Sequence, residues 1–379
     1  MSGTGCVMIH VQHLLGIGHL QRALGLAASL TESGFQVVVA SGGKPTKIDS
    51  PAGIQLFQLD PLHSLDGSFD ILLDQQNQPI GDRWRESRCK QLLGLFHRFK
   101  PQILITETFP FGRRMLRFEL LPLLEAARQD PNCQLIVSSI RDVLQPKSKP
   151  GREEEVIELI ERYYDRVLIH GDKRVSSLGD SFAEAGQIAD KVNYSGYIAR
   201  SVDLPAQPKN IEVLVSAGGS DRGLAILTTA IATRPASTLA DHPWRILVSH
   251  AIADSEFTKL TNLATDGIVV ERNRRDFPVL LANARLSIFQ AGYNTMTDLL
   301  ATRTPAVVVP FAEAGEREQS IRAGQLRNLN RVAVLPEQEL SVDAMATAID
   351  GACQLESDIE VDLNGAQHSA GMISNWYNT

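Results

Sequence analysis

Cysteine is scarce in this chain, and its spacing excludes the usual cysteine chemistry. Four cysteines occur in 379 residues, with no CxxC pair and no histidine nearby at zinc-ligand spacing. A disulfide framework or a zinc site would require such spacing. We therefore expect the four cysteines to be reduced and to pack within the fold: Cys6, Cys89, Cys133 and Cys353.

Long apolar runs and a surplus of positive charge are also missing. No stretch reaches the roughly 18 uninterrupted apolar residues of a membrane span, and Met1–Gln12 lacks the features of a secretory signal. Lys and Arg number 37 against 44 for Asp and Glu, a net charge of −7, and no polybasic tract could neutralise a nucleic acid. The sequence predicts a cytoplasmic protein without a nucleic-acid partner, with at most peripheral contact to the cytosolic face of a membrane.

The residues that are present form two halves with the same opening. The hydrophobic fraction of 43% and the charged fraction of 21% are those of a globular chain. In each half a β-prone run, Val7–Gln12 or Ile211–Ser216, leads into a glycine loop and then into a helical apolar period. Strands and helices alternate throughout, which favours parallel sheets. We expect an α/β protein with two Rossmann-like, doubly wound parallel-sheet domains that face a cleft.

A polar segment with two prolines, Asp203–Asn210, marks the expected domain boundary. Residues 1–203 then form an N-terminal domain, and residues 204–355 form a C-terminal domain. The remaining tail, residues 356–379, is expected to pack back on the first domain.

The first glycine loop places a histidine at a helix start. Gly16 and Gly18 precede His19, and N–H groups at a helix N-terminus favour an anion or developing negative charge. The loop lacks the third glycine of a dinucleotide fingerprint, and no acidic residue follows the strand Phe35–Ala40, so NAD binding is disfavoured. His19 could act as a base near neutral pH. A packing or surface histidine is the other interpretation.

The second loop follows the first strand of the second half. Gly218 and Gly219 are flexible enough to wrap a phosphate, and Ser220 supplies a hydroxyl. No Gly-Lys-Ser/Thr follows, so the loop is not a Walker A motif and phosphoryl transfer is disfavoured. A tight turn with a helix N-cap remains the alternative.

The third loop runs into a helix that carries an aspartate. Gly292, Asn294 and Thr295 can offer N–H groups to a diphosphate. Asp298, one turn later, accepts hydrogen bonds only and suits a ribose diol, although it could instead simply complement the helix dipole. The chain contains no Asp-x-Asp pair, so the sequence implies no metal to bridge a diphosphate.

A fourth candidate segment follows a strand of the first half. Glu107 comes directly after this strand, Ile103–Thr106, and Arg113 and Arg114 follow a few residues later, at the edge that carries sites in open α/β sheets. Glu107 is a candidate acceptor-side base, and the arginines are candidates for binding an acidic acceptor. A turn with solvated arginines is the alternative.

Taken in order, these motifs resemble those of the GT-B glycosyltransferases, and especially the bacterial N-acetylglucosaminyltransferases that complete lipid II. The resemblance rests on the loop with His19, the Ala-Gly-Gly-Ser loop, the run Ala-Gly-Tyr-Asn-Thr-Met-Thr-Asp, and Pro310-Phe311 followed by Glu316–Gln319. It spans nearly the whole chain.

The resemblance implies roles for individual donor-site residues. Gly218, Gly219 and Ser220 would touch the donor diphosphate. Asp298 stands where the family has a ribose-binding glutamate, while Gln319, beside Glu318, matches a glutamine that holds the donor sugar. Arg272 and Asn273 correspond to the strand end that reads uracil through its backbone, and Arg272 would add positive charge for the diphosphate.

The implied function is a metal-independent inverting glycosyltransferase without a cofactor. It would move a sugar from a UDP-sugar, for which UDP-N-acetylhexosamine is one candidate, to a small-molecule or lipid-linked acceptor, with His19 as base or as a stabiliser on the oxyanion side. Asp298 is one methylene shorter than the family's glutamate, and the first loop has fewer glycines, so the sugar and the acceptor stay open. Gly16–Arg22 is also similar to the opening of UDP-sugar hydrolases of the same fold. A non-catalytic sugar-nucleotide-binding protein is a further alternative.

Overall fold

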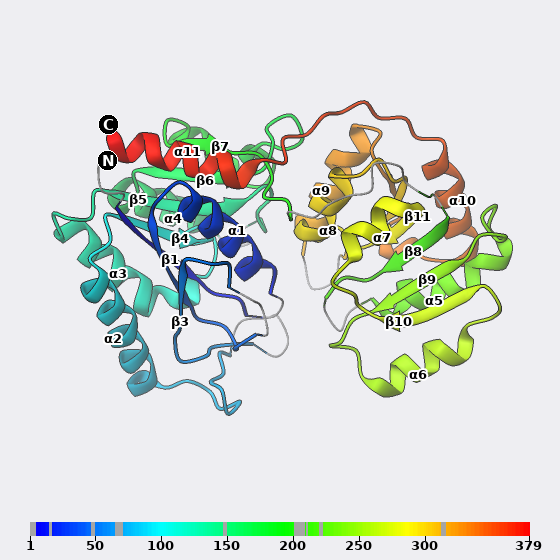
Figure 1. The fold of residues 1–379 in the computed structure, drawn as a ribbon, viewed down its shortest axis with the longest axis horizontal. Coiled ribbons are helices and arrows are strands. Elements are labelled where there is room, and N and C mark those ends of the chain that lie inside the picture. The colour runs from blue at the N-terminus through cyan, green and yellow to red at the C-terminus, as the bar shows by residue number, and fades with distance from the viewer. Residues whose placement is uncertain are drawn as a thin grey trace. The chain divides into compact units, whose positions relative to one another are not determined.

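The chain forms two compact units in a computed structural model (Figure 1). Unit 1 comprises Met1–Lys173, Phe182–Ile198 and Asn364–Thr379, and unit 2 comprises Arg174–Ser181 and Ala199–Leu363. The structure describes residues 5–14, 17–46, 50–64, 71–146, 150–200, 209, 211–219, 223–311 and 316–379.

Unit 1 is built on a parallel sheet with the strand order β3-β2-β1-β4-β5-β6-β7. Its strands are β1 (Cys6–Val11), β2 (Gln36–Ser41), β3 (Ile54–Gln58), β4 (Ile103–Glu107), β5 (Leu135–Arg141), β6 (Arg166–His170) and β7 (Val192–Tyr194). The chain runs outward from β1 to β3 and then returns to β4 on the other side of β1. The strand order therefore reverses between β1 and β4, the point at which open α/β sheets bind ligands.

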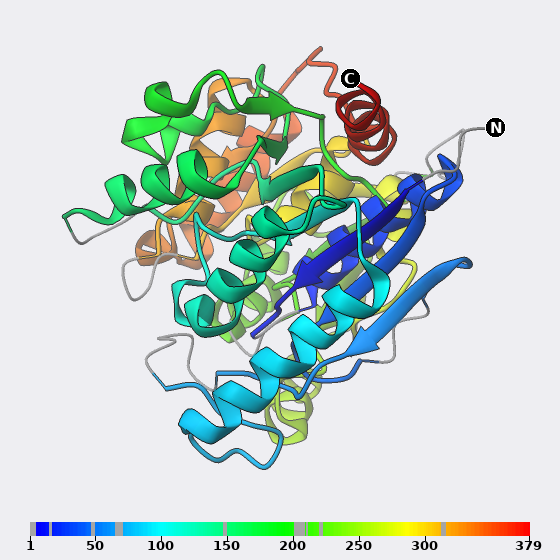
Figure 2. The same cartoon turned by 90° about the vertical axis from the view of Figure 1, so that its left-hand side faces the viewer.

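Helices cover both faces of this sheet. They are α1 (Gly18–Glu32), α2 (Asp82–Phe99), α3 (Arg117–Gln129), α4 (Arg152–Tyr163) and α11 (Gly365–Asn378), with short 3-10 helices at Arg114–Leu116 and Ala183–Ile188. The apolar residues of α1, from Leu20 to Leu30, lie at helical spacing and are buried in one cluster with Ala370 and Ile373 of α11. The C-terminal helix α11 therefore lies against α1 (Figure 1), whereas α2 and α3 lie on the opposite face of the sheet (Figure 2).

The units differ in detail from the expected domain bounds. Unit 2 begins at Ala199 rather than at residue 204, and the return to unit 1 begins at Asn364 rather than at residue 356. The segment before Asn364 stays with unit 2, where the Ser357 hydroxyl donates to the Leu329 carbonyl at 2.9 Å. Arg174–Ser181, with its 3-10 helix at Leu178–Asp180, also belongs to unit 2, because Gln325 Nε2 donates to Asp180 Oδ2 at 2.7 Å.

Unit 2 repeats the architecture with the parallel order β10-β9-β8-β11-β12-β13. Its strands are β8 (Glu212–Ser216), β9 (Trp244–Val248), β10 (Ile268–Arg272), β11 (Ala284–Phe289), β12 (Ala306–Val308) and β13 (Ala333–Val334). Its helices are α5 (Leu224–Thr233), α6 (Asp254–Leu263), α7 (Phe277–Asn283), α8 (Tyr293–Leu300), α9 (Glu318–Asn328) and α10 (Val342–Cys353), with 3-10 helices at Arg234–Ala236 and Glu337–Glu339. Here the order reverses between β8 and β11, which makes the ends of these two strands the expected ligand position.

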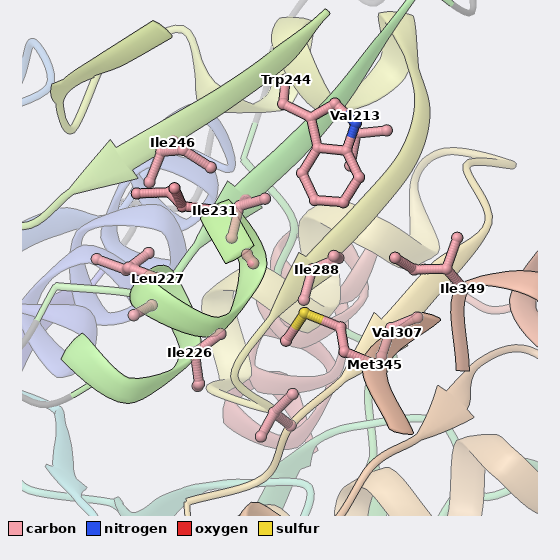
Figure 3. Packing of buried hydrophobic residues seen from close by; sticks show 14 of the residues in the cluster. Val213, Ile226, Leu227, Ile231, Trp244, Ile246, Ile288, Val307, Met345 and Ile349 are labelled. Atoms are coloured by element: carbon pink, nitrogen blue, oxygen red, sulfur yellow. The ribbon is translucent and has the colours of Figure 1, made fainter. Parts of the chain in front are cut away.

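The core of unit 2 fixes the strands that carry its loops. Trp244 of β9 is fully buried among aliphatic side chains of α5, β11 and α10 (Figure 3), and its indole N–H donates to the Leu239 carbonyl at 3.1 Å. Ile288 of β11 and Met345 of α10 lie in the same cluster. Each fully buried side chain of this size stabilises the fold by about 1.5–3 kcal/mol, so the strand ends are held on a rigid base.

The four cysteines are unpaired, as expected. Burial raises the pKa of Cys6 to about 11 and that of Cys133 to about 12, so these thiols stay protonated and unreactive near neutral pH. Among the described residues, no helix is long and apolar enough to cross a membrane.

Candidate active site

The reversal point of unit 1 brings His19 and Glu107 together. His19 lies in the first turn of α1, which follows β1, and Glu107 is the last residue of β4. Because β1 and β4 are adjacent and parallel, their carboxyl ends meet at one edge of the sheet. His19 Nδ1 lies 2.8 Å from Glu107 Oε1 and 3.0 Å from Oε2. The sequence predicted both residues as candidates but not their contact.

The contact fixes the histidine tautomer. An ionised carboxylate only accepts hydrogen bonds, so we assign the ring proton to Nδ1 and the lone pair to Nε2. The Glu107 side chain is 2% exposed and that of His19 is 14% exposed. Glu107 therefore orients the imidazole from one side, and Nε2 is the ring nitrogen that can accept a proton.

Two arginines complete this cluster. Arg22, one turn further along α1, forms an ion pair with Glu107. Arg113 approaches from the segment after β4, and its Nη2 lies 3.0 Å from His19 Nε2 while its Nε donates to the Gln12 carbonyl at 3.1 Å. Two guanidinium groups and one carboxylate thus surround the imidazole.

These surroundings set the protonation states. Burial lowers the pKa of His19 to about 3, with Arg113 acting in the same direction and Glu107 opposing it. Burial alone would raise the pKa of Glu107, but His19, Arg22 and Arg113 together hold it well below its usual range. Near neutral pH the pair is therefore a neutral imidazole beside a carboxylate. Glu107 already accepts from His19 Nδ1 and pairs with Arg22, so the structure favours Glu107 as the group that orients His19 rather than as a separate base.

The structure separates the two candidate acceptor-side arginines. Arg114 turns away from His19 to an exposed ion pair in which its Nε lies 3.0 Å from Glu155 Oε2. Of these two arginines, Arg113 is the one that contacts the imidazole. Gly18 begins α1, while Gly16 lies outside the described residues.

Sequence reasoning missed a buried arginine that supports this edge of unit 1. Arg88 of α2 is fully buried and forms an ion pair with Glu119 of α3, with its Nε 2.7 Å from Oε2. Its Nη2 donates to Gln12 Oε1 at 2.6 Å, and its Nη1 donates to the Gly42 carbonyl at 3.0 Å and to the Asp60 carbonyl. Arg88 therefore ties together the segments that follow β1, β2 and β3. Helix α2 carries four arginines, and nothing in the sequence distinguishes Arg88 from Arg83, Arg85 and Arg98.

The reversal point of unit 2 carries the glycine loops. Gly218 and Gly219 follow β8, and Gly292 follows β11 as the N-cap of α8, so Asn294 and Thr295 lie in the first turn of that helix. Among the described residues, a Cβ atom at any of these three glycines would meet no atom within 4 Å. The backbone there is open to close approach by a ligand, beside the N–H groups of a helix start. Ser220 lies outside the described residues.

Arg272 and Asn273 stabilise the neighbouring strand ends. Asn273 Nδ2 donates to the Gly218 carbonyl at 2.8 Å, which ties the end of β10 to the glycine loop. Arg272 donates to the Ser249 and Ile252 carbonyls at 2.7 and 2.8 Å and forms an ion pair with Asp254. The Arg272 side chain thus holds the segment between β9 and α6, and its role toward a diphosphate stays a prediction.

Asp298 has a partner that the sequence did not indicate. Its side chain is 2% exposed, and Arg200 contacts both carboxylate oxygens, with Nε 3.0 Å from Oδ1 and Nη2 paired with Oδ2. Burial raises the pKa of Asp298, and Arg200 counteracts this effect. A ribose diol at this position would share the carboxylate with Arg200.

Glu318 and Gln319 connect elements of unit 2. Gln319 Oε1 accepts from the Phe311 N–H at 3.1 Å, and Glu318 Oε1 accepts from Arg322 Nη2 at 2.8 Å. The buried Arg322 also donates to the Ala291 carbonyl at 2.8 Å. These contacts fix the start of α9 against the loop before α8. In the described part of the chain, no group of three or more His, Cys, Asp or Glu side chains could hold a metal ion.

Comparison with solved structures defines the class of fold. The calicheamicin glycosyltransferase CalG4 aligns with a TM-score of 0.65 and 14% identity over 99% of this chain and 98% of that chain. MurG of Acinetobacter baumannii aligns with a TM-score of 0.60 and 14% identity over 98% of this chain and 99% of that chain. The chain therefore has the GT-B fold of glycosyltransferases, as the sequence predicted.

Sequence comparison shows which glycosyltransferases the chain is similar to. Residues 213–362 match the glycosyltransferase family 28 C-terminal domain. The UDP-N-acetylglucosamine–N-acetylmuramyl-(pentapeptide) pyrophosphoryl-undecaprenol N-acetylglucosamine transferase of Trichodesmium erythraeum is 26% identical over 190 residues, 50% of this chain and 49% of that protein. Its counterpart in Rippkaea orientalis is 24% identical over 225 residues, 59% of this chain and 61% of that protein. The alignments thus span about half the length of these relatives, and the expected similarity to this transferase is confirmed.

Proposed function

We propose that the chain is an inverting glycosyltransferase that uses a UDP-sugar. The observation that carries the proposal is the His19–Glu107 pair at the reversal point of unit 1, with Nδ1 2.8 Å from Oε1 and the lone pair on Nε2. Such a pair is the arrangement required of a general base whose protonated form is stabilised by a neighbouring carboxylate. The family 28 domain in unit 2 supports the same class of reaction.

The proposed donor is a UDP-N-acetylhexosamine, bound by unit 2. The open backbone at Gly218, Gly219 and Gly292 would receive the diphosphate, and Asp298 with Arg200 would hold the ribose. The curated relatives carry UDP-N-acetylglucosamine in their name, which supports the choice of sugar. The proposal requires neither a metal nor a cofactor.

The proposed acceptor carries an acidic group that Arg113 binds. A guanidinium prefers phosphate and carboxylate partners, which it holds with charge-assisted hydrogen bonds. The name of the curated relatives specifies a pyrophosphoryl-undecaprenol acceptor, and this supports a lipid-linked diphosphate as the acceptor class. Work on such a lipid would place the protein in the cytoplasm with peripheral contact to the cytosolic face of the membrane.

The chemistry follows from the geometry of His19. As the acceptor hydroxyl attacks the anomeric carbon, Nε2 takes the hydroxyl proton and the bond from that carbon to the UDP oxygen breaks. Glu107 stabilises the imidazolium that forms, because its carboxylate already accepts the Nδ1 proton at 2.8 Å. General-base help of this kind contributes roughly 10²–10⁴-fold to the rate.

UDP release from UDP-N-acetylglucosamine, with and without a pyrophosphoryl-undecaprenol-linked acceptor, tests the proposal. Release that depends on the acceptor supports a transferase. Equal release without it identifies a hydrolase of the same fold, and UDP binding without release identifies a sugar-nucleotide-binding protein. Either of these last two results would contradict the proposal.

A further inference from the structure

The lone pair on His19 Nε2, which the proposed mechanism needs, already accepts a hydrogen bond in this structure. Glu107 engages Nδ1 of His19, so Nε2 is the ring nitrogen left to accept a proton. Arg113 Nη2 lies 3.0 Å from this nitrogen. A neutral imidazole has one lone pair, and a lone pair that accepts from a guanidinium is not open to a hydroxyl.

A hydrogen bond to the backbone carbonyl of Gln12 holds the Arg113 guanidinium in this position. Its Nε donates to the Gln12 carbonyl at 3.1 Å. The Gln12 side chain is in turn fixed by Arg88 at 2.6 Å and by its own bond to the Leu62 carbonyl at 2.9 Å. Gln12 and Arg88 are both fully buried. Arg113 is thus a half-buried side chain anchored on the rigid core of unit 1.

We propose that Arg113 caps the base His19 in the free protein and that an anionic group of the acceptor removes the cap. The inference rests on the proposed function and deepens it, because it names what the acceptor must carry next to its reacting hydroxyl. A guanidinium binds a phosphate or carboxylate with hydrogen bonds in which both partners are charged, often two in parallel, whereas the imidazole is a neutral, single acceptor. A phosphate or carboxylate therefore draws Arg113 away from the neutral imidazole.

The cap protects the donor from water. While Arg113 is hydrogen-bonded to Nε2, His19 cannot accept a proton from a water molecule that attacks the anomeric carbon. With Nε2 uncovered and no acceptor present, Nε2 takes a proton from water as the water oxygen bonds to the anomeric carbon and the bond to the UDP oxygen breaks. The products are the free sugar and UDP, and His19 returns its proton to solvent. Removal of the cap should therefore turn a transferase partly into a hydrolase.

The first test is Arg113→Gln, assayed for UDP release from UDP-N-acetylglucosamine without any acceptor. We expect release to rise at least about tenfold, within the range that a general base supplies. Arg85→Gln is the matched control, because Arg85 is an exposed arginine of α2 that contacts the Phe118 ring; its release should equal that of the wild type. If Arg113→Gln does not fold, Arg113→Lys keeps the charge but loses the forked contact, and it should change release in the same direction. Where the wild type releases UDP with the acceptor present, unchanged acceptor-free release in the folded variant would overturn the proposal.

The second test reads the contact without turnover. In ¹⁵N-labelled protein, the His19 Nε2 resonance should shift when Arg113→Gln removes the hydrogen bond, and inorganic phosphate should produce the same shift in the wild type but none in the variant. An unshifted resonance in the variant, or no effect of phosphate on the wild type, would contradict the cap. Loss of the hydrogen bond without UDP release from any variant would instead contradict the proposed function while supporting the cap, so the two failures are distinguishable.

Discussion

His19 and Glu107 act as one group at the ends of two neighbouring strands, with Nδ1 of the imidazole 2.8 and 3.0 Å from the two carboxylate oxygens. The residues are 88 positions apart in the sequence, and the parallel pairing of β1 with β4 brings them together. The carboxylate fixes the tautomer that leaves Nε2 as the base. The proposed reaction therefore requires both members of the pair.

Replacing Glu107 with Gln should reduce turnover without weakening donor binding. The amide keeps the shape of the side chain but cannot stabilise the imidazolium, so we expect kcat to fall by about 10²-fold or more. UDP affinity should stay unchanged because the proposed donor site lies in unit 2. Initial rates and calorimetric UDP titrations measure the two effects, with Glu155→Gln as a control in the same unit. A kcat within about twofold of the wild type would refute the role of Glu107.

The ion pair between Asp298 and Arg200 should support UDP binding from both sides. Asp298→Ala removes the proposed ribose acceptor and should weaken UDP binding by roughly 1–3 kcal/mol, the scale of a lost charge-assisted hydrogen bond. Arg200→Ala should also weaken UDP binding. Burial raises the pKa of Asp298 and Arg200 opposes that effect, so without Arg200 the carboxylate is held less firmly in its ionised, hydrogen-bond-accepting form. Calorimetry with UDP checks both, and Asp343→Ala on the exposed start of α10 is the control. Unaltered UDP affinity in a folded Asp298→Ala protein would remove this residue from the donor site.

Arg88 should be a strong contributor to the stability of unit 1. Arg88→Met leaves the fully buried Glu119 carboxylate without its cation, and loss of one partner of a buried ion pair costs about 3–5 kcal/mol. Arg85→Met, in an exposed position on the same helix, should cost far less. Urea unfolding followed by circular dichroism compares the two variants. Equal urea midpoints for the two variants would show that the contacts of Arg88 do not stabilise unit 1.

Two buried histidines should make unit 1 less stable as the pH falls. His170 at the end of β6 contacts the Ser139 hydroxyl at 2.7 Å and the Ser195 hydroxyl at 3.1 Å, and burial lowers its pKa to about 3, as it does for His19. Both rings are neutral in the folded state, whereas in the unfolded chain they protonate below about pH 6.5. The unfolded state therefore binds more protons between about pH 6.5 and pH 3, and the free energy of unfolding falls by up to about 1.4 kcal/mol per pH unit for each ring.

The substitution His170→Gln isolates one of these rings. It removes one titrating group while an amide can still contact the serine hydroxyls, so the slope of stability against pH should become shallower. Urea midpoints measured at intervals from pH 7 to pH 4 give the slope. An identical slope in wild type and variant would mean that His170 is not kept neutral by the fold.

The sequence predicted what depends on local pattern. The apolar spacing from Leu20 to Leu30 indicated α1, and the glycine loops after β-prone runs indicated the loops that follow β8 and β11. Contacts between distant residues could not be predicted, because they depend on the strand order. Arg113 is 94 residues from His19, and Arg200 is 98 residues from Asp298. The positions of Gly16 and Ser220 lie outside the described residues, so their roles stay predictions.

His19→Ala, assayed for both turnover and nucleotide binding, tests the account most directly. We expect kcat for acceptor-dependent UDP release to fall by roughly 10²–10⁴-fold, while the Kd for UDP, measured on the same preparation, stays nearly unchanged because the proposed donor site lies in unit 2. A variant that keeps full turnover would remove His19 from the mechanism. A variant that instead loses UDP binding would place His19 in donor recognition and contradict its assignment as the base.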